Sequence, residues 1–293
     1  MDGLLIVNKP EGLTSAEVVR IAKRRLRCKV GHLGTLDPFA SGVLPLCLDA
    51  GTKIAQFLNT ADKGYSGIIR LGSETETGDP TGTVTQTAPV PTLTAVQLEA
   101  VALRLHGELV QTPPMYSALK RQGTPLYKLA RQGIVVDREP RRVRIDALRL
   151  LDDVDGRICF DVACSKGTYV RVLAQQIAAA LGTVGHLERL RRTRFGQFRL
   201  GDAVSMDTLV HGAVAPLGLR ASLGHLREII LDASAARRAQ QGYEPLLETI
   251  GPGARGETVK LVGPSGELAA VATVDEDGRW RFARVFSDGP RAS

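Results

Sequence analysis

GHLGTLDPFASG runs from Gly31 to Gly42 and leads into the apolar segment VLPLCL at residues 43–48. Pro38 disfavours the α-helical conformation at Asp37 and shifts that residue toward an extended backbone. The two glycines upstream of Asp37 allow a second backbone or a ligand to approach closely. These residues therefore predict a stiff loop that presents the carboxylate of Asp37. Because an isolated Asp-Pro pair is usually a turn initiator, a function for this loop depends on the rest of the chain.

The composition is that of an ordinary globular protein. The chain has 293 residues, and at roughly 100 to 200 residues per domain this length predicts about two folded units. Hydrophobic residues make up 43% and charged residues 24% of the chain, which excludes a disordered or low-complexity protein. No apolar segment approaches the roughly 18 to 20 residues that cross a bilayer, and the N-terminus lacks the features of a signal peptide. We therefore expect a cytoplasmic protein that has no membrane partner.

The cysteines and the familiar cofactor motifs point away from metal or cofactor chemistry. The four cysteines, Cys28, Cys47, Cys159 and Cys164, include no Cys-x-x-Cys pair, so buried free thiols are favoured over a disulfide framework or a zinc site. P-loop, zinc-protease, zinc-deaminase and nucleophile-elbow motifs do not occur. Gly251–Gly256 matches the letters of a dinucleotide-binding motif, but it precedes an expected strand instead of opening a helix, so we expect a turn-rich loop there. We expect no metal and no organic cofactor.

Positive charge is concentrated in the N-terminal part of the chain. The net charge is +7, but residues 228–293 contain 8 basic and 10 acidic residues, so the first 227 residues carry a net charge of +9. Basic segments lie at residues 20–29, 120–144 and 189–199. A single basic segment is commonly a solvated face, but three in one unit favour a polyanionic partner such as nucleic acid.

The pattern of secondary-structure signals predicts an α+β fold on a mixed or antiparallel sheet. Capping boxes predict helices that begin at Thr14 and at Thr94, and we expect the second helix to end at Gly107. Hydrophobic periodicity predicts strands at 63–71, 82–90, 157–164, 258–262, 268–274 and 279–286, and further helices at 170–181 and 232–242.

We expect two domains. Residues 1–227 form the larger α+β unit, and residues 228–293 form a small β-rich unit. Residues 112–140 are basic and are interrupted by prolines and glycines, which indicates an inserted arm that becomes ordered around a ligand.

Five further segments carry distinctive motifs. They are Asn8-Lys9-Pro10-x-Gly12-x-Thr14-Ser15, Asp62-Lys63-x-Tyr65, Thr75-x-Thr77-x-Asp79-x-x-Gly82, Pro114-Met115-Tyr116-Ser117-Ala118-Leu119-Lys120 and Cys164-Ser165-Lys166-Gly167-Thr168-Tyr169-Val170-Arg171. Together with the loop at 31–42 they resemble, in order and spacing, the motifs of the bacterial TruB family of tRNA pseudouridine-55 synthases. The resemblance covers residues 3–200 and implies a pseudouridine synthase catalytic domain with an inserted arm. The C-terminal unit more weakly resembles the RNA-binding PUA domain.

The resemblance also implies a set of site residues. Asp37 corresponds to the catalytic aspartate, Tyr65 to the tyrosine that stacks on the target base, and Arg171 to the arginine that pairs with the aspartate. His32 corresponds to a histidine that helps to disrupt the RNA loop. The remaining implied pocket residues are Lys9, Tyr169 and Leu190.

Two physical arguments are independent of this resemblance. Isomerising uridine breaks the N1–C1′ bond, and the positive character that develops at C1′ can be stabilised or captured by a carboxylate, as in glycoside cleavage. Arg171 falls in the first turn of its expected helix, where the helix dipole disfavours a cation by about 0.3 to 1 kcal/mol. A nearby carboxylate would offset this cost, and Asp37 is the partner that we expect.

The sequence leaves three functions open. We expect a monomeric enzyme that isomerises the uridine at position 55 in the T-arm loop of tRNA. The first alternative is a pseudouridine synthase subunit that depends on a guide RNA, and the second is a tRNA-binding folding chaperone. Residues 112–140 favour the stand-alone enzyme because they resemble the bacterial insert.

Overall fold

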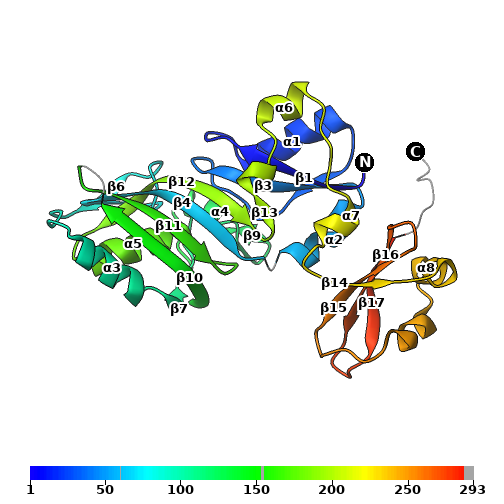
Figure 1. Cartoon of the computed structure of the whole chain (residues 1–293). Helices are drawn as coiled ribbons and strands as arrows, with labels where there is room; N and C mark the ends of the chain where they lie inside the picture. Colours follow the sequence, from blue (N-terminus) through cyan, green and yellow to red (C-terminus); the bar gives the residue numbers. More distant parts are fainter. Residues whose placement is uncertain (60, 153–154, 287–293) are drawn as a thin grey trace.

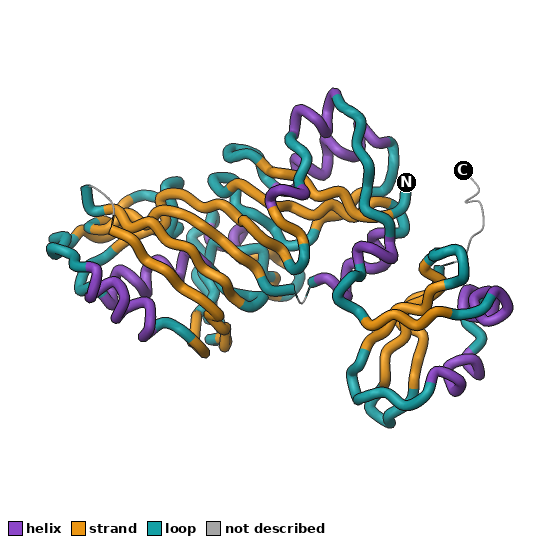
Figure 2. Tube along the Cα trace, viewed as in Figure 1, coloured by secondary structure: helices purple, strands orange, loops and turns teal. Residues whose placement is uncertain are grey.

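The centre of the molecule is one long mixed sheet (Figures 1 and 2). The computed structural model describes residues 1–59, 61–152 and 155–286. Within these residues the sheet has nine strands in the order β1-β3-β12-β4-β11-β10-β7, with β2 beside β3 and β13 beside β12. The strands are β1 (Gly3–Lys9), β2 (Val30–His32), β3 (Ser41–Leu48), β4 (Lys63–Leu71), β7 (Gly107–Gln111), β10 (Arg141–Asp152), β11 (Arg157–Cys164), β12 (Gly185–Phe195) and β13 (Phe198–Arg199). β12 pairs with β3 in parallel and the other neighbours are antiparallel, which confirms the predicted α+β class.

The main helices cover one face of this sheet. They are α1 (Ser15–Leu26), α3 (Ala95–Arg104) and α5 (Val170–Ala180), and α3 and α5 lie behind β10 and β11 in Figure 1. Val18 of α1 and Leu173 of α5 share one buried apolar cluster with Ile69 and Ile158 of the sheet. Because side chains alternate along a strand, Tyr65 lies on this covered face and Ser66 on the opposite face.

The segment expected to be an inserted arm is folded into short elements. It contains β8 (Lys120–Arg121), β9 (Thr124–Pro125) and α4 (Leu126–Ala130). The buried side chain of Leu126 anchors the arm. A separate small hairpin, β5 (Ser73–Thr75) and β6 (Val84–Thr87), lies beside β12. The arm therefore contains short regular elements, and its ordering around a ligand stays a prediction.

A second sheet follows near the C-terminus, in the order β14-β15-β16-β17. Its strands are β14 (Arg227–Ile230), β15 (Thr258–Val262), β16 (Leu268–Val274) and β17 (Trp280–Val285), and its helical segments are α8 (Ala233–Gln240) and η2 (Glu244–Ile250).

The connection to the main sheet contains η1 (Leu200–Asp202), α6 (Met206–His211) and α7 (Leu219–Ser222), and α2 (Gly51–Leu58) follows β3. Val262 and Phe286 share an apolar cluster with Leu4 and Ile54, so the two sheets are joined by packed side chains. Residues 287–293 of the expected C-terminal unit lie outside the described residues, and the domain boundary stays a prediction.

Most of the expected elements are present, and two have different limits. Both capping boxes are formed, at Thr14 and at Thr94. The helix after Thr94 ends at Arg104, because Gly107 has a φ of +88° and already begins β7. The strand expected at 82–90 is limited to β6, because Gly82 closes a turn by donating its N–H to the carbonyl of Asp79. Among the described residues no helix is long and apolar enough to span a membrane.

Candidate active site

The loop that carries Asp37 lies between β2 and β3 and is tied to the rest of the protein on both sides of this residue. Before it, the hydroxyl of Ser15 accepts a hydrogen bond from the Leu36 N–H (2.9 Å) and donates one to the Leu36 carbonyl (3.1 Å). After it, the carbonyl of Pro38 accepts a hydrogen bond from the ammonium of Lys9 (3.3 Å). Helix α1 and the end of β1 therefore fix the backbone on which the carboxylate stands.

Arg171 contacts the carboxylate of Asp37 through two nitrogens. The distances are 3.0 Å from Nε to Oδ2 and 3.5 Å from Nη2 to Oδ1. The guanidinium also donates to the carbonyls of Thr77 (2.7 Å) and Tyr116 (2.6 Å). The side chain of Arg171 is only 6% exposed, whereas that of Asp37 is 37% exposed. The arginine is thus held by its neighbours, while the carboxylate keeps an accessible surface for a substrate.

A second carboxylate, that of Asp79, lies on the other side of the same guanidinium. Its Oδ2 is 3.5 Å from Nη1 of Arg171. Its Oδ1 accepts hydrogen bonds from the hydroxyl of Thr77 (2.7 Å) and from the N–H (2.9 Å) and hydroxyl (2.6 Å) of Thr81. Sequence reasoning placed Asp79 in a motif but not in the site. The available signal was an aspartate in a turn segment, since an Asp side chain in a turn commonly accepts a hydrogen bond from the backbone two residues on, as Asp79 does from the Thr81 N–H.

Opposing effects act on the ionisation of Asp37. Burial raises the pKa of Asp37, the charge of Arg171 lowers it, the carboxylate of Asp79 raises it and Lys9 lowers it, and the net result is a pKa above the ordinary value of 3.8. The carboxylate that would meet a developing positive charge is therefore less stabilised as an anion than a free aspartate, which makes it a stronger base.

Tyr65 lies beside this loop on β4, directly opposite Arg192 on β12. Its side chain is buried at 8% exposure, and it belongs to the same apolar cluster as Leu36 and Leu190. Burial raises the pKa of Tyr65, and the charge of Arg192 opposes this rise, so the phenol is neutral at physiological pH. A neutral aromatic ring in an apolar wall can stack on a base.

The other expected pocket residues surround this centre. Burial and the charge of Arg192 lower the pKa of His32, so its imidazole is neutral near pH 7, and its Nδ1 is buried without a hydrogen-bond partner among the described residues. Burial lowers the pKa of Lys9 to about 8, and its ammonium donates to three carbonyls. Tyr169 is the residue before α5, where its N–H donates to the side chain of Gln111 (2.9 Å) and burial raises the pKa of its phenol.

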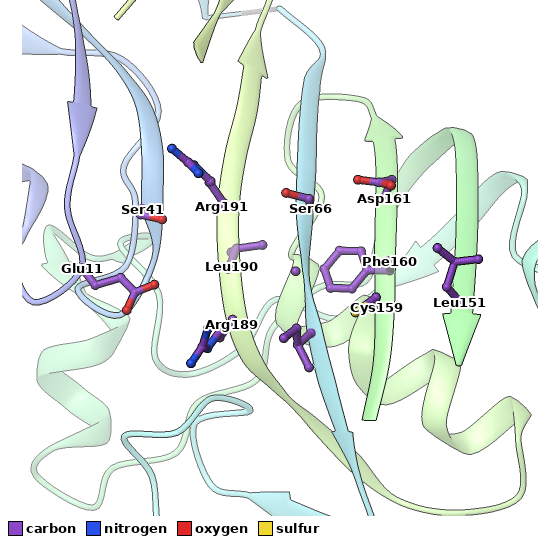
Figure 3. A pocket seen from close by; sticks show the side chains of 12 residues that line it. Glu11, Ser41, Ser66, Leu151, Cys159, Phe160, Asp161, Arg189, Leu190 and Arg191 are labelled. Atoms are coloured by element: carbon purple, nitrogen blue, oxygen red, sulfur yellow. The ribbon is translucent and has the colours of Figure 1, made fainter. Parts of the chain in front are cut away.

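A hollow in the surface lies away from this centre. It has a volume of about 400 Å³ and opens on the face opposite Tyr65, where Ser66, Asp161 and Arg191 line it from neighbouring strands (Figure 3). Leu190 borders it, but Asp37, Tyr65 and Arg171 do not. The candidate active site is therefore the group around Asp37 on the covered face. In the part of the chain that the structure describes, no three His, Cys, Asp or Glu side chains are grouped so as to hold a metal ion.

Chains in other solved structures share this fold. It matches a chain in the crystal structure of a Cbf5-Nop10-Gar1 complex with a TM-score of 0.70 and 24% identity, over 97% of this chain and 84% of that chain. It also matches a chain in the structure of an H/ACA RNP bound to a substrate RNA containing 2′-deoxyuridine, with a TM-score of 0.71 and 22% identity, over 99% of this chain and 86% of that chain. These two likenesses establish the fold, a long mixed sheet followed by a second, smaller sheet.

The family follows from the sequence matches. Residues 20–170 match the model of the TruB family pseudouridylate synthase N-terminal domain, and residues 171–236 match that of the tRNA pseudouridylate synthase B C-terminal domain. The chain is 47% identical to tRNA pseudouridine synthase B of Aromatoleum aromaticum over 83% of this chain and 80% of the relative. It is 46% identical to that of Burkholderia lata over 89% of this chain and 83% of the relative. The chain belongs to the TruB family of pseudouridylate synthases, which confirms the family resemblance and the enzyme class.

Proposed function

We propose that this enzyme isomerises uridine to pseudouridine at position 55 in the T-arm loop of tRNA. The observation that carries the proposal is the contact between Asp37 and Arg171 beside Tyr65, on a loop fixed from both sides. Relatives at 46–47% identity are named tRNA pseudouridine synthase B, and this supports tRNA as the substrate. The net charge of +9 on the first 227 residues suits a polyanionic substrate of this kind.

The chemistry requires one carboxylate and no external reagent. The N1–C1′ bond breaks, the uracil turns over, and C5 bonds to C1′ and releases its proton while N1 gains one, so the atoms and charge balance. Asp37 acts at the ribose, where positive character develops at C1′. Arg171 holds the carboxylate in one orientation. Water needs to be kept out, because the base must return to C1′ before a hydroxyl does.

The target nucleotide must leave its stack to reach this site. Flipping a base costs a few kcal/mol, and stacking on an aromatic ring returns about 1 to 3 kcal/mol. Tyr65 is the stacking partner, and Leu190 lies in the same apolar wall. His32, whose neutral imidazole has no hydrogen-bond partner for Nδ1 among the described residues, can hydrogen-bond the opened RNA loop, while Lys9 and Tyr169 shape the pocket. The enzyme works as a monomer in the cytoplasm, and the C-terminal PUA-like unit adds a weaker RNA contact.

The decisive experiment maps pseudouridine by mass spectrometry. A tRNA transcript is incubated with the purified chain and no additive, and a single pseudouridine at position 55 is expected. A bare T-arm stem-loop is expected to react as well. Modification only in the presence of a guide RNA would instead favour the guide-dependent subunit, and binding without modification would favour the folding chaperone.

A further inference from the structure

Arg192 is a buried arginine for which the mechanism above has no use. The residue is 1% exposed and stands on β12 in the wall of the candidate active site. Among the residues that the structure describes, no carboxylate lies within ion-pair distance of it, and burial lowers the pKa of its guanidinium. An arginine that is desolvated without a counter-ion is costly, and an apolar side chain would fill the same space more cheaply. Its position therefore needs another explanation.

The guanidinium joins three parts of the site. Its Nε donates to the carbonyl of Val43 on β3 (2.7 Å), and its Nη2 donates to the carbonyl of Gly34 in the Asp37 loop (2.7 Å). The phenol of Tyr65, the residue paired with Arg192 across the strands, lies within reach of the same guanidinium, and the two groups interact electrostatically. Its Cζ atom lies 5.3 Å from the centre of the Phe195 ring. Gly34 is packed so closely that a Cβ there would meet the Phe195 ring at 2.7 Å.

These contacts fix the proton of the Tyr65 hydroxyl as well as its place. A guanidinium has donors and no acceptor, so in a hydrogen bond between these two groups the phenol oxygen accepts from Arg192. The O–H of Tyr65 is then left to donate to a group other than Arg192. A carbonyl oxygen of a bound base is an acceptor of suitable chemistry. A lysine could not replace the planar fork, because an ammonium is a point charge that cannot span the three acceptors in one plane.

We propose that Arg192 is a positioning residue for the reaction. It holds the Tyr65 phenol and the Asp37 loop in one fixed frame and directs the phenol O–H toward the base carried by the substrate. The inference rests on the proposed roles of Asp37 and Tyr65. It adds a hydrogen bond from the enzyme to the flipped base, which the stacking role alone does not supply.

A double-mutant cycle tests this inference. Wild type, Tyr65→Phe, Arg192→Lys and the double variant are compared for the single-turnover rate of pseudouridine formation and for tRNA affinity. Arg192→Lys is expected to lower the rate at least about tenfold while the Kd changes less than about twofold, and this rate loss is expected to be at least about threefold smaller in the Tyr65→Phe background. Arg191→Lys is the matched control, because this neighbour points to the opposite face of the strand, and it is expected to keep the wild-type rate.

Equal rate losses in the two backgrounds would overturn the proposal, because Arg192 would then not act through the phenol. A loss of affinity with an unchanged rate would overturn it as well. If Arg192→Lys does not fold, Arg192→Gln repeats the cycle with a neutral side chain that still donates. The wild-type product, mapped by position, tests the proposed substrate separately, so failure of the T-arm assignment and failure of the Arg192 assignment give different results.

Discussion

At the scale of single residues, the site depends on one guanidinium that is shared by two carboxylates. Arg171 lies between Asp37 and Asp79, at 3.0 Å and 3.5 Å. Its position in the first turn of α5 predicted that it needs an acidic partner, and the sequence alone identified Asp37 as that partner. The second partner was missed, because Asp79 is 92 residues away along the chain and no local pattern relates the two.

Replacing the carboxylate of Asp37 tests its chemical role. Asp37→Asn keeps the size of the side chain but removes the charge that would meet C1′. We expect turnover to fall at least about a thousandfold, equivalent to about 4 kcal/mol of barrier, while tRNA affinity stays near that of the wild type. Single-turnover assays and filter binding measure the two quantities. A variant that keeps most of its turnover would show that another group performs the chemistry.

Replacing Asp79 tests the electrostatic balance. The negative charge of Asp79 raises the pKa of Asp37, because it disfavours a second anion nearby. Asp79→Asn removes that charge, so the pKa of Asp37 falls. Asp37 must be ionised to act, and the acid limb of kcat/KM is therefore expected to move to lower pH.

The measurement is a pH–rate profile from about pH 4 to pH 8. Asp207→Asn is the control, since the side chain of Asp207 is 85% exposed and lies on α6. An acid limb that stays in place or moves to higher pH in Asp79→Asn would contradict the assignment. So would an equal shift in the control.

At the scale of secondary-structure elements, local signals predicted well and pairing did not. The capping boxes at Thr14 and Thr94 and the alternation of β11 appear in the structure as expected, because each depends on neighbours in sequence. The parallel pairing of β12 with β3 could not be read from the sequence. It joins only two residue pairs, Arg191 with Ser41 and Arg192 with Gly42, across about 150 residues. That pairing is what brings Arg192 to the loop that carries Asp37.

The link between α1 and the loop that carries Asp37 provides a specific test at this scale. Ser15→Ala removes both hydrogen bonds to Leu36 and leaves a buried N–H unpaired. We expect the free energy of unfolding to fall by about 1 to 3 kcal/mol. We also expect the single-turnover rate to fall at least about tenfold, because a small displacement of Asp37 misaligns the reaction.

Thr94→Ala is the matched control for this variant. It removes the cap of α3, away from the site, and is expected to cost about 1 kcal/mol of stability without changing the rate. Urea unfolding and single-turnover assays measure both variants. A rate loss of equal size in Thr94→Ala would mean that the rate follows global stability instead of the position of the loop.

At the scale of the whole molecule, the sequence predicted the fold class and the family, and it left the relation between the two sheets undetermined. Apolar side chains of the C-terminal sheet, such as Val262, pack in one cluster with Leu4 of β1. Contacts of this kind join residues more than 200 positions apart and leave no periodic trace in either segment. The site itself was predictable only where motif residues were involved. Arg192, which meets the loop through carbonyl oxygens, gave no signal, because carbonyls are present at every position.

The uneven distribution of charge leads to a prediction about RNA binding. In a chain with the basic residues concentrated before residue 228, phosphate contacts should come from the N-terminal part. About five such contacts give a slope of about −3.5 to −4.5 for log K against log salt concentration.

The exposed basic side chains at the end of α1, Lys23 and Arg24, are candidates for two of them. Lys23→Gln with Arg24→Gln should make the slope shallower by about 1.4 to 1.8. The control is Arg255→Gln, which removes an exposed charge from the acidic C-terminal part and should leave the slope unchanged. Titration of Asp37→Asn enzyme with tRNA at several salt concentrations measures the slopes without turnover. If the control flattens the slope and the α1 variant does not, the RNA lies on the C-terminal sheet and the charge argument is wrong.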